Sequence, residues 1–296
     1  MKTISILYNP AKKLANQYLE KVASFGGIIG AGIEDYLNPV SSYNAAIGRR
    51  AVVEEYERLL DNNELSTLVT GLNYKMGMVL NNAYDGEWRV DRWISMELKT
   101  DSDFIRPADN LIGTYLPPKI TEGGMRFDGT QYMYNPITTS MNYQNVNNDI
   151  TISVVFNSDT KASINSFFSD YSQNNELGFF WMYYSPITTR TTMQYKDLTN
   201  NTFVQSLISQ SMQIKTDNNL IFSERYNDTR YSMTNGIYAK LSTLTFETIF
   251  PPKRNIFLCT YSPGHVSMYV GYIKHFYWYK SLFTLEQGTN FYNKLG

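Results

Sequence analysis

Alternating apolar and polar residues between positions 123 and 156 constrain the fold more than any other feature of the sequence. In the first half, Met125 and Phe127 alternate with polar residues before an Asp128-Gly129 turn signal. In the second half every second residue is apolar, namely Ile150, Ile152, Val154 and Phe156. Side chains of a strand point alternately to its two faces, so this period of two predicts half-buried antiparallel strands joined by a polar, Asn-rich loop.

Further short apolar runs continue to the end of the chain, separated by polar turns. They lie at residues 178–184, 220–222, 236–241, 244–250, 256–261 and 266–276. Regular short strands with such turns predict an antiparallel β-sandwich. Residues 162–171 leave two alternatives open, because Ile164, Phe167 and Phe168 fit the spacing of a helix nearly as well as that of a strand.

The first third of the chain shows helical spacing instead. Asn9 is a suitable N-cap for a helix that begins at Pro10 and continues to about Phe25. A second helix is expected after Pro39, over residues 41–61, and its apolar pattern resumes over residues 64–80. Residues 88–99 then alternate in a way that predicts a strand with one charged face.

Prolines mark a connector between these two parts of the chain. Pro107, Pro117 and Pro118 lie within residues 101–118, which show no periodic pattern. We therefore expect a helical N-terminal region with one strand or hairpin over residues 1–110, serving attachment or oligomerisation. Residues 111–296 are expected to form a jelly-roll β-sandwich, so the fold class is mainly β.

The two ends of the second part resemble a laminin-G-like or concanavalin-A-like jelly roll. The opening resemblance is carried by the Phe127-Asp128-Gly129 turn and the alternating strand that ends at Phe156. The closing resemblance is carried by Gly271, Ile273, Phe276, Tyr279, Leu282 and Glu286, although the spacer between Tyr279 and Leu282 is one residue shorter than usual. This resemblance spans residues 123–295 and implies a fold that hosts lectins, adhesion modules, glycan hydrolases and virion parts.

Charge and hydropathy exclude several classes of protein. A formal net charge of -1 gives no electrostatic argument for a nucleic-acid partner. No apolar run is long enough to cross a bilayer. The first residues lack a signal-peptide pattern, which predicts synthesis in a cytoplasm. The single cysteine, Cys259, stands in an apolar run and is expected to be a buried small side chain.

Catalytic residues for glycan hydrolysis are not evident. Hydrolysis needs two carboxylates on opposite sides of the scissile bond. The resemblance implies that they would stand on one strand as Glu-x-Asp-x-Glu, and the sequence has no such run. The two histidines, His265 and His275, are expected to be structural. We therefore expect a protein without enzymatic activity.

The resemblance implies calcium as the one ion or cofactor to consider, held by oxygen ligands in loops at one end of the sandwich. The candidate ligands are Asp128, Asp149, Asp217 and Asp228. Related domains carry a second acidic residue just after the turn, whereas Gln131 and Tyr132 stand there in this chain.

Sugar binding uses aromatic rings for stacking and amide groups for hydroxyls. The loops supply both kinds of side chain, and aromatic residues make up 15% of the chain. The candidate ligand-binding residues are Tyr132, Tyr143, Asn145, Tyr226 and Tyr231.

These observations lead to one hypothesis and two alternatives. The leading hypothesis is a virion structural protein, made in the host cytoplasm, such as a bacteriophage decoration, fibre or tail-associated protein. Its helical region would contact other virion proteins or further copies of the chain, most plausibly as a trimer, and its sandwich would bind host-surface glycans. The alternatives are a cellular carbohydrate-binding or adhesion protein and a polysaccharide hydrolase with the same fold.

Overall fold

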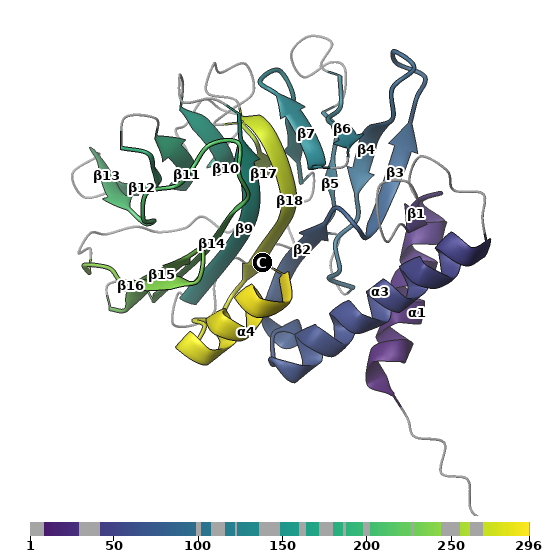
Figure 1. The fold of residues 1–296 in the computed structure, drawn as a ribbon, viewed down its shortest axis with the longest axis horizontal. Coiled ribbons are helices and arrows are strands. Elements are labelled where there is room, and N and C mark those ends of the chain that lie inside the picture. Colours follow the sequence, from purple (N-terminus) through teal and green to yellow (C-terminus); the bar gives the residue numbers. More distant parts are fainter. Residues whose placement is uncertain are drawn as a thin grey trace, which may run out of the picture.

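The computed structural model describes thirteen stretches of the chain and leaves the residues between them undescribed. The described residues are 9–29, 42–98, 102–107, 116–121, 123–135, 149–159, 164–171, 180–185, 188–197, 202–225, 228–243, 255–260 and 269–295. The fold is a mainly antiparallel β-sandwich with helices at one side (Figure 1).

One layer of the sandwich, called the helix-facing layer, contains six strands. Its order is β16-β15-β14-β9-β18-β2, and every neighbouring pair is antiparallel. The strands are β16 (Ile237–Lys240), β15 (Arg230–Thr234), β14 (Asn218–Arg225), β9 (Asp149–Ser158), β18 (Val270–Tyr279) and β2 (Leu68–Asn73).

The second layer, called the far layer, contains ten strands and is also antiparallel. Its order is β13-β12-β11-β10-β17-β8-β5-β4-β3-β1. The strands are β13 (Thr202–Leu207), β12 (Arg190–Asp197), β11 (Phe180–Ser185), β10 (Asn165–Tyr171), β17 (Asn255–Leu258), β8 (Met133–Tyr134), β5 (Phe104–Ile105), β4 (Arg89–Trp93), β3 (Gly77–Asn81) and β1 (Ile28–Ile29). The pair β6 (Lys119–Thr121) and β7 (Gly124–Asp128) joins the layers, since β7 pairs with β18 and β6 with β4.

The main core lies between the two layers, and the apolar residues that alternate in β9 point into it. Ile152 and Val154 are buried in this core, while Thr151 and Ser153 lie on the other face of the strand. Opposite them, Phe168 of β10 packs against Trp278 of β18 with ring centroids 5.5 Å apart. The alternating run therefore forms the strand that the sequence predicts, and Cys259 is buried beside the same core as expected.

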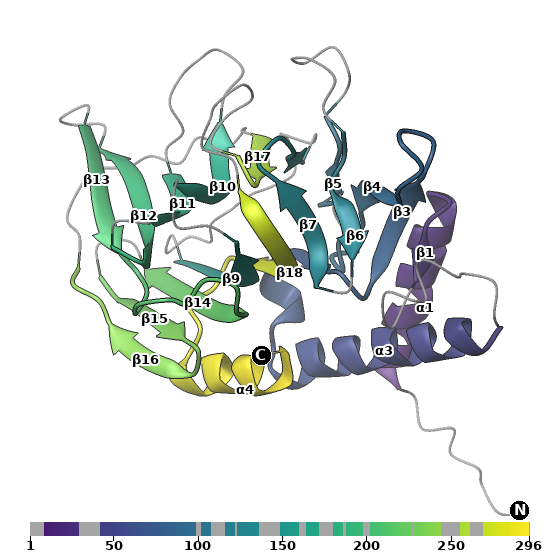
Figure 2. The same ribbon diagram turned by 45° about the horizontal axis from the view of Figure 1, so that its top comes forward.

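Three helices lie on one side of the molecule (Figure 1). They are α1 (Pro10–Ser24), α3 (Ser42–Asp61) and α4 (Leu285–Leu295), and Figures 1 and 2 show α3 and α4 running across this side of the molecule. There α1 packs against α3 and against β1 and β3 of the far layer. Asn9 caps α1 as predicted, because its side-chain oxygen accepts a hydrogen bond from the Lys12 amide at 3.2 Å.

A second apolar cluster lies between these helices and the sheet. It contains Tyr18 of α1, Tyr56 of α3, Tyr277 of β18 and Phe291 of α4. The apolar stripes of α1 and α3 are therefore buried within this chain. They do not form the free attachment surface that an amphipathic helix suggests from sequence.

The prediction of a helix over residues 64–80 is wrong. The sequence predicts helix there, whereas the chain forms a short 3-10 turn (Leu65–Thr67), then β2 and β3. Every residue of β2 is buried, because the two layers pack on one face and the helices on the other. Apolar residues of β2 lie on both faces, so their spacing fits a helix equally well. For residues 162–171 the sequence fits a helix or a strand, and the structure shows strand β10 over residues 165–171.

Strand pairing crosses the connector at which a domain boundary is expected. Leu72 of β2 is the register partner of Phe276 of β18, so residues from both parts of the chain share one sheet. The division at residue 110 itself remains a prediction. No helix among the described residues is long and apolar enough to span a membrane.

Candidate binding site

A row of side chains crosses four strands on the outer face of the helix-facing layer. Asn219 of β14 is the register partner of Val155 in β9, and Val155 is the partner of His275 in β18. His275 is in turn the partner of Asn73 at the end of β2. Adjacent strands lie about 4.8 Å apart, so Asn219 and His275 stand roughly 10 Å from each other along this row.

This row forms the floor of a polar pocket with a volume of about 470 Å³. The end of α4 and the turns after β2 and β15 provide its walls. The lining residues are Asn73, Tyr74, Lys75, Val155, Asp217, Asn219, Asn235, Lys274, His275, Tyr292, Lys294 and Leu295.

Asn219 is the most unusual residue of the polar pocket. It is only 5% exposed, and neither its side-chain oxygen nor its side-chain nitrogen has a hydrogen-bond partner among the described residues. Leaving a buried polar group unpaired costs about 1–3 kcal/mol. An amide in this position is therefore free to bind a ligand that carries both a donor and an acceptor.

The Asn235-Gly236 turn fixes the position of Asn219. Both turn residues have positive φ, 50° and 81°, as a two-residue type I′ hairpin requires. The backbone N–H of Asn219 donates to the Asn235 side-chain oxygen at 2.7 Å. The backbone N–H of Asn235 donates to the backbone carbonyl of Asn219 at 2.8 Å. The backbone of Asn219 is thus held on both sides while its side chain remains unpaired.

His275 is the second buried polar group on the floor. It is 3% exposed, and its Nε2 atom has no hydrogen-bond partner among the described residues. Burial, together with the positive charges of Arg58 and Lys274, lowers the pKa of His275 to about 3. The imidazole is therefore neutral at physiological pH and offers a hydrogen bond without a charge.

Lysines dominate the charge of the polar pocket. Lys75, Lys274 and Lys294 line it, whereas Asp217 is its one carboxylate. Asp217 forms an ion pair with Lys274 and accepts a hydrogen bond from the Asn157 side chain at 3.2 Å. Lys294 lies 3.9 Å from Asp61, a residue outside the polar pocket whose side chain is 70% exposed.

A longer groove of about 730 Å³ adjoins the polar pocket and follows the side of α3. The two hollows share Asn73, Lys75, Lys294 and Leu295, so they form one continuous depression. Along the groove, acidic residues of α3 such as Glu54 are balanced by basic ones such as Arg50.

A buried ionic network holds α3 against the sheet beneath this depression. Arg58 forms ion pairs with Glu55 at 2.7 Å and with Glu64 at 2.6 Å. The Tyr277 hydroxyl donates to Glu55 at 2.6 Å, and the Tyr279 hydroxyl donates to Glu64 at 2.8 Å. Each carboxylate thus has a cation and a phenol as partners, so these acidic residues of the helical region serve the fold.

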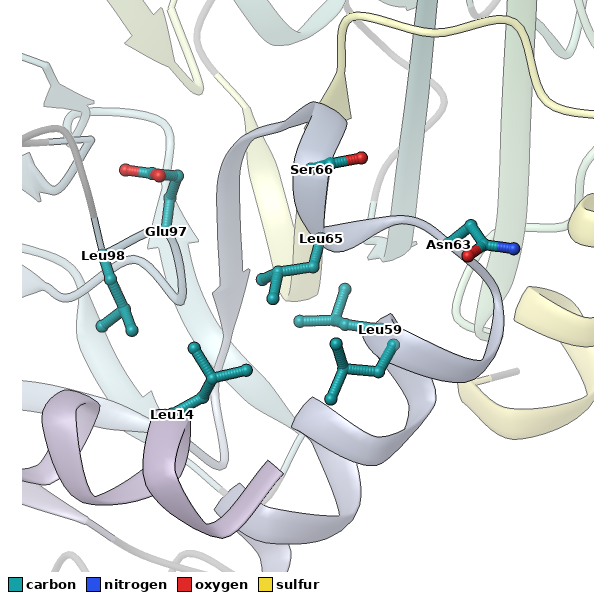
Figure 3. A pocket seen from close by; sticks show the side chains of 8 residues that line it. Leu14, Leu59, Asn63, Leu65, Ser66, Glu97 and Leu98 are labelled. Carbon is teal, nitrogen blue, oxygen red and sulfur yellow. The ribbon is translucent and has the colours of Figure 1, made fainter. Parts of the chain in front are cut away.

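A separate apolar hollow of about 260 Å³ lies between α1, the end of α3 and the 3-10 turn. Figure 3 shows Leu14, Leu59 and Leu65 turned toward one another there, with Glu97 at one side. Its lining is mostly leucine, so it provides no set of convergent polar groups for a sugar.

Glu224 of β14 is an acidic residue buried beside a tyrosine and an arginine. Arg230 pairs with it at 2.9 Å, and the Tyr195 hydroxyl donates to it. Burial raises the pKa of Glu224, although the positive charge of Arg230 opposes the shift. All three side chains are buried, so this carboxyl group does not reach the surface.

Of the aromatic residues predicted to bind a ligand, the two that the structure describes do not line the polar pocket. Tyr132 is 1% exposed and packs against Phe257, and Tyr231 is 4% exposed and donates to the Phe283 carbonyl. Neither ring presents a face to solvent in this structure. Tyr143, Asn145 and Tyr226 lie outside the described residues.

The four aspartates predicted to bind calcium are also engaged separately. Asp128 accepts hydrogen bonds from Thr130, and Asp149 forms an ion pair with Arg225 at 2.7 Å. Asp217 pairs with Lys274 in the polar pocket, and Asp228 lies in the turn between β14 and β15. Within the described stretches, no three His, Cys, Asp or Glu side chains form a group that could hold a metal ion. Calcium binding remains a prediction.

The residues on the pocket floor were not identified as a site from the sequence. His275 is expected to be structural, and it is buried as that expectation implies. One signal in the sequence is that Asn219 and His275 are polar residues directly before the apolar runs 220–222 and 276–279.

Comparisons with known proteins show similarity of fold only. No protein-family model matches the chain, and no curated protein sequence matches it. Trypanosoma rangeli sialidase in complex with sialic acid matches with a TM-score of 0.54 at 10% identity, over 83% of this chain and 39% of that one. A second structure of the Trypanosoma rangeli enzyme, bound to a difluoro-nononic acid, gives a TM-score of 0.53 at 10% identity, over 77% and 32%.

The botulinum neurotoxin serotype D binding domain is also similar, with a TM-score of 0.51 at 8% identity. The match covers 79% of this chain and 53% of that one. This chain therefore spans about a third to a half of the length of these structures. They support a sandwich or jelly-roll type of β fold.

Proposed function

We propose that this chain is a non-enzymatic glycan-binding protein and that the polar pocket is its binding site. The observation that carries the proposal is the Asn219 side chain, which is buried in the pocket floor with both of its polar atoms unpaired. A pair of neighbouring sugar hydroxyls supplies one donor and one acceptor, the combination that an amide needs. Binding would therefore remove the cost of the unpaired amide.

The remaining lining supports a sugar over an apolar ligand. His275 adds a neutral hydrogen-bonding nitrogen, and the rings of Tyr74 and Tyr292 line the same pocket. Aromatic faces stack on the apolar side of a sugar ring while amides and imidazoles bind its hydroxyls. The sialidase in complex with sialic acid and the toxin binding domain are consistent with this chemistry, and their likeness to this chain is one of fold.

The carboxylates near the polar pocket favour binding over hydrolysis. Asp217 is the one carboxylate that lines the pocket, and it is paired with Lys274. A glycosidase of the usual kind needs a second carboxyl group facing the first across the bond. The polysaccharide hydrolase is therefore the less favoured alternative.

A glycan array with three forms of the full chain tests the proposal. The forms are the natural sequence, Asn219→Leu, and the matched control Asn82→Leu, which changes an exposed asparagine in the turn after β3. We expect specific binding by the natural chain and the control, and loss of binding by Asn219→Leu. Absence of binding by the folded natural chain would refute the proposal.

Unfolding measurements separate a binding role of Asn219 from a structural one. Leucine fills about the same volume and removes an unpaired buried amide, so we expect Asn219→Leu to be as stable as the natural chain or more stable. A clear loss of stability would mean that the amide supports the fold instead.

The setting that we propose is a virion, with the chain made in the host cytoplasm and the sandwich displayed to bind host glycans. Contacts of the N-terminal region with other virion proteins or further copies belong to the same proposal, which rests on the sequence pattern. A cellular adhesion protein is the alternative. Mass spectrometry of purified particles distinguishes them, because a virion protein must be present there in fixed proportion to the other structural proteins.

A further inference from the structure

We infer that the polar pocket selects acidic glycans, whose carboxylate or sulfate group lies between Lys75 and Lys294. The inference rests on the proposed function and adds the chemical class of the ligand. It comes from Lys75 and Lys294, which stand where the polar pocket meets the groove.

The charges at the pocket end do not cancel. Lys75, Lys274 and Lys294 contribute three positive charges and Asp217 one negative charge, which leaves a net charge of +2. His275 adds none, since burial keeps it neutral. The same Lys75 and Lys294 also line the groove, whose other charged residues are Arg50, Arg58, Glu54, Glu55, Glu57 and Asp61. Arg50 is paired there with Glu54 and Arg58 with Glu55.

Two of the three lysines are available to a ligand. Lys274 is already paired with Asp217. Lys75 is exposed and has no ion-pair partner among the described residues, although its ammonium group lies 5.7 Å from the Tyr74 ring. Lys294 has its nearest carboxylate at 3.9 Å, on an exposed Asp61. An anionic ligand therefore does not have to break a buried ion pair.

The position of Lys75 and Lys294 determines where the acidic group of a bound glycan would lie. Both line the polar pocket and the groove, so they stand where the two hollows meet. Asn219 and His275 lie on the floor of the pocket itself. A glycan with hydroxyls on the floor would thus direct its acidic group toward the junction.

Matched pairs of acidic and neutral probes test the inference on the full chain. The probes are an oligogalacturonate with its carboxyl-reduced counterpart, and a dextran sulfate oligosaccharide with unsulfated dextran of the same length. An exposed ion pair contributes about a threefold gain in affinity, so two lysines predict a preference of about tenfold for an acidic probe. The two probe pairs show whether carboxylate or sulfate is preferred.

Charge-removing variants locate the effect. The double variant Lys75→Gln/Lys294→Gln should lose the preference, measured as the ratio of its affinities for the acidic and the neutral probe. Lys240→Gln, which changes an exposed lysine on β16, should keep the ratio of the natural chain. Raising the salt concentration from about 0.1 M to about 1 M shortens the Debye length from about 10 Å to about 3 Å, so it should remove most of the preference.

The possible failures are distinguishable. Equal binding of acidic and neutral probes by the natural chain would overturn the inference and leave glycan binding intact. A preference that survives in the double variant would overturn the assignment to Lys75 and Lys294. No binding of any probe by the folded chain would count against the proposed function as well.

Discussion

Replacing Arg58 by methionine should strongly destabilise the fold. Arg58 is 3% exposed and pairs with Glu55 and Glu64, which are 6% and 0% exposed. The variant keeps most of the side-chain volume and leaves both carboxylates without their cation. Removing one partner of a buried ion pair costs about 3–5 kcal/mol of unfolding free energy, and we expect a loss in this range at neutral pH.

The same helix supplies a matched control. Arg50 pairs with Glu54 at 2.7 Å, but the two side chains are 82% and 57% exposed. Exposed pairs of this kind contribute about 0.3–0.5 kcal/mol, so Arg50→Met should cost no more than that. Urea denaturation of the natural chain and both variants, followed by circular dichroism, gives the two differences.

The loss caused by Arg58→Met should depend on pH. Burial already raises the pKa of Glu64, and the charge of Arg58 is the first of the effects that lower it. Without Arg58 the folded-state pKa rises further above the unfolded value, so the folded chain binds more protons. The loss relative to the natural chain should therefore be smallest at acidic pH and grow as pH rises through the new pKa. A loss below about 1 kcal/mol at neutral pH, or an equal loss for Arg50→Met, would refute the role assigned to this network.

Two further predictions concern the closing strand. His275 has a folded-state pKa of about 3 against an ordinary 6.5, so stability should be lost as pH falls from 6.5 toward 3, by up to roughly 4–5 kcal/mol at about 1.4 kcal/mol per pKa unit. His275→Gln should reduce this loss in acid-denaturation curves, and unchanged curves would contradict the assignment. Gly271→Ala should destabilise the fold by about 1–3 kcal/mol or prevent folding, because a Cβ would lie 2.2 Å from the Asn157 carbonyl oxygen where φ is +149°. Gly86→Ala, at φ +83° with no atom within 4 Å, is the control and should cost only the backbone strain of about 1–2 kcal/mol. Equal losses in urea denaturation would show that the contact with Asn157 is unimportant.

The fold could be predicted from sequence wherever one face of a helix or strand carries apolar residues and the other carries polar ones. Asn9 and Pro10 indicate the beginning of α1, and the alternation from Ile150 to Phe156 indicates β9. The pattern fails in β2, which places Leu68 in the second cluster and Val69 and Leu72 in the main core. β9 is also buried on both faces, but Thr151 and Ser153 occupy one of them and so preserve the alternation. The apolar faces of α1 and α3 are buried within the same chain, and attachment of this region to partners remains a prediction.

The candidate site could not be predicted, because it is created by strand register. Asn73, Val155, Asn219 and His275 come from four strands far apart in the sequence. A shift of one residue in any of these strands would turn its side chain to the opposite face of the sheet. The tyrosines chosen from sequence met the chemical requirement for sugar binding, but Tyr132 and Tyr231 are buried by packing that composition does not reveal.

The position of a bound glycan tests the central claim most directly. A crystal structure of the full chain, grown with the tightest ligand from the array, locates the sugar without any substitution. We predict that its hydroxyls bind the Asn219 amide and His275 Nε2 on the floor of the polar pocket. A sugar bound anywhere else on the molecule, with the Asn219 side chain still unpaired, would contradict the account.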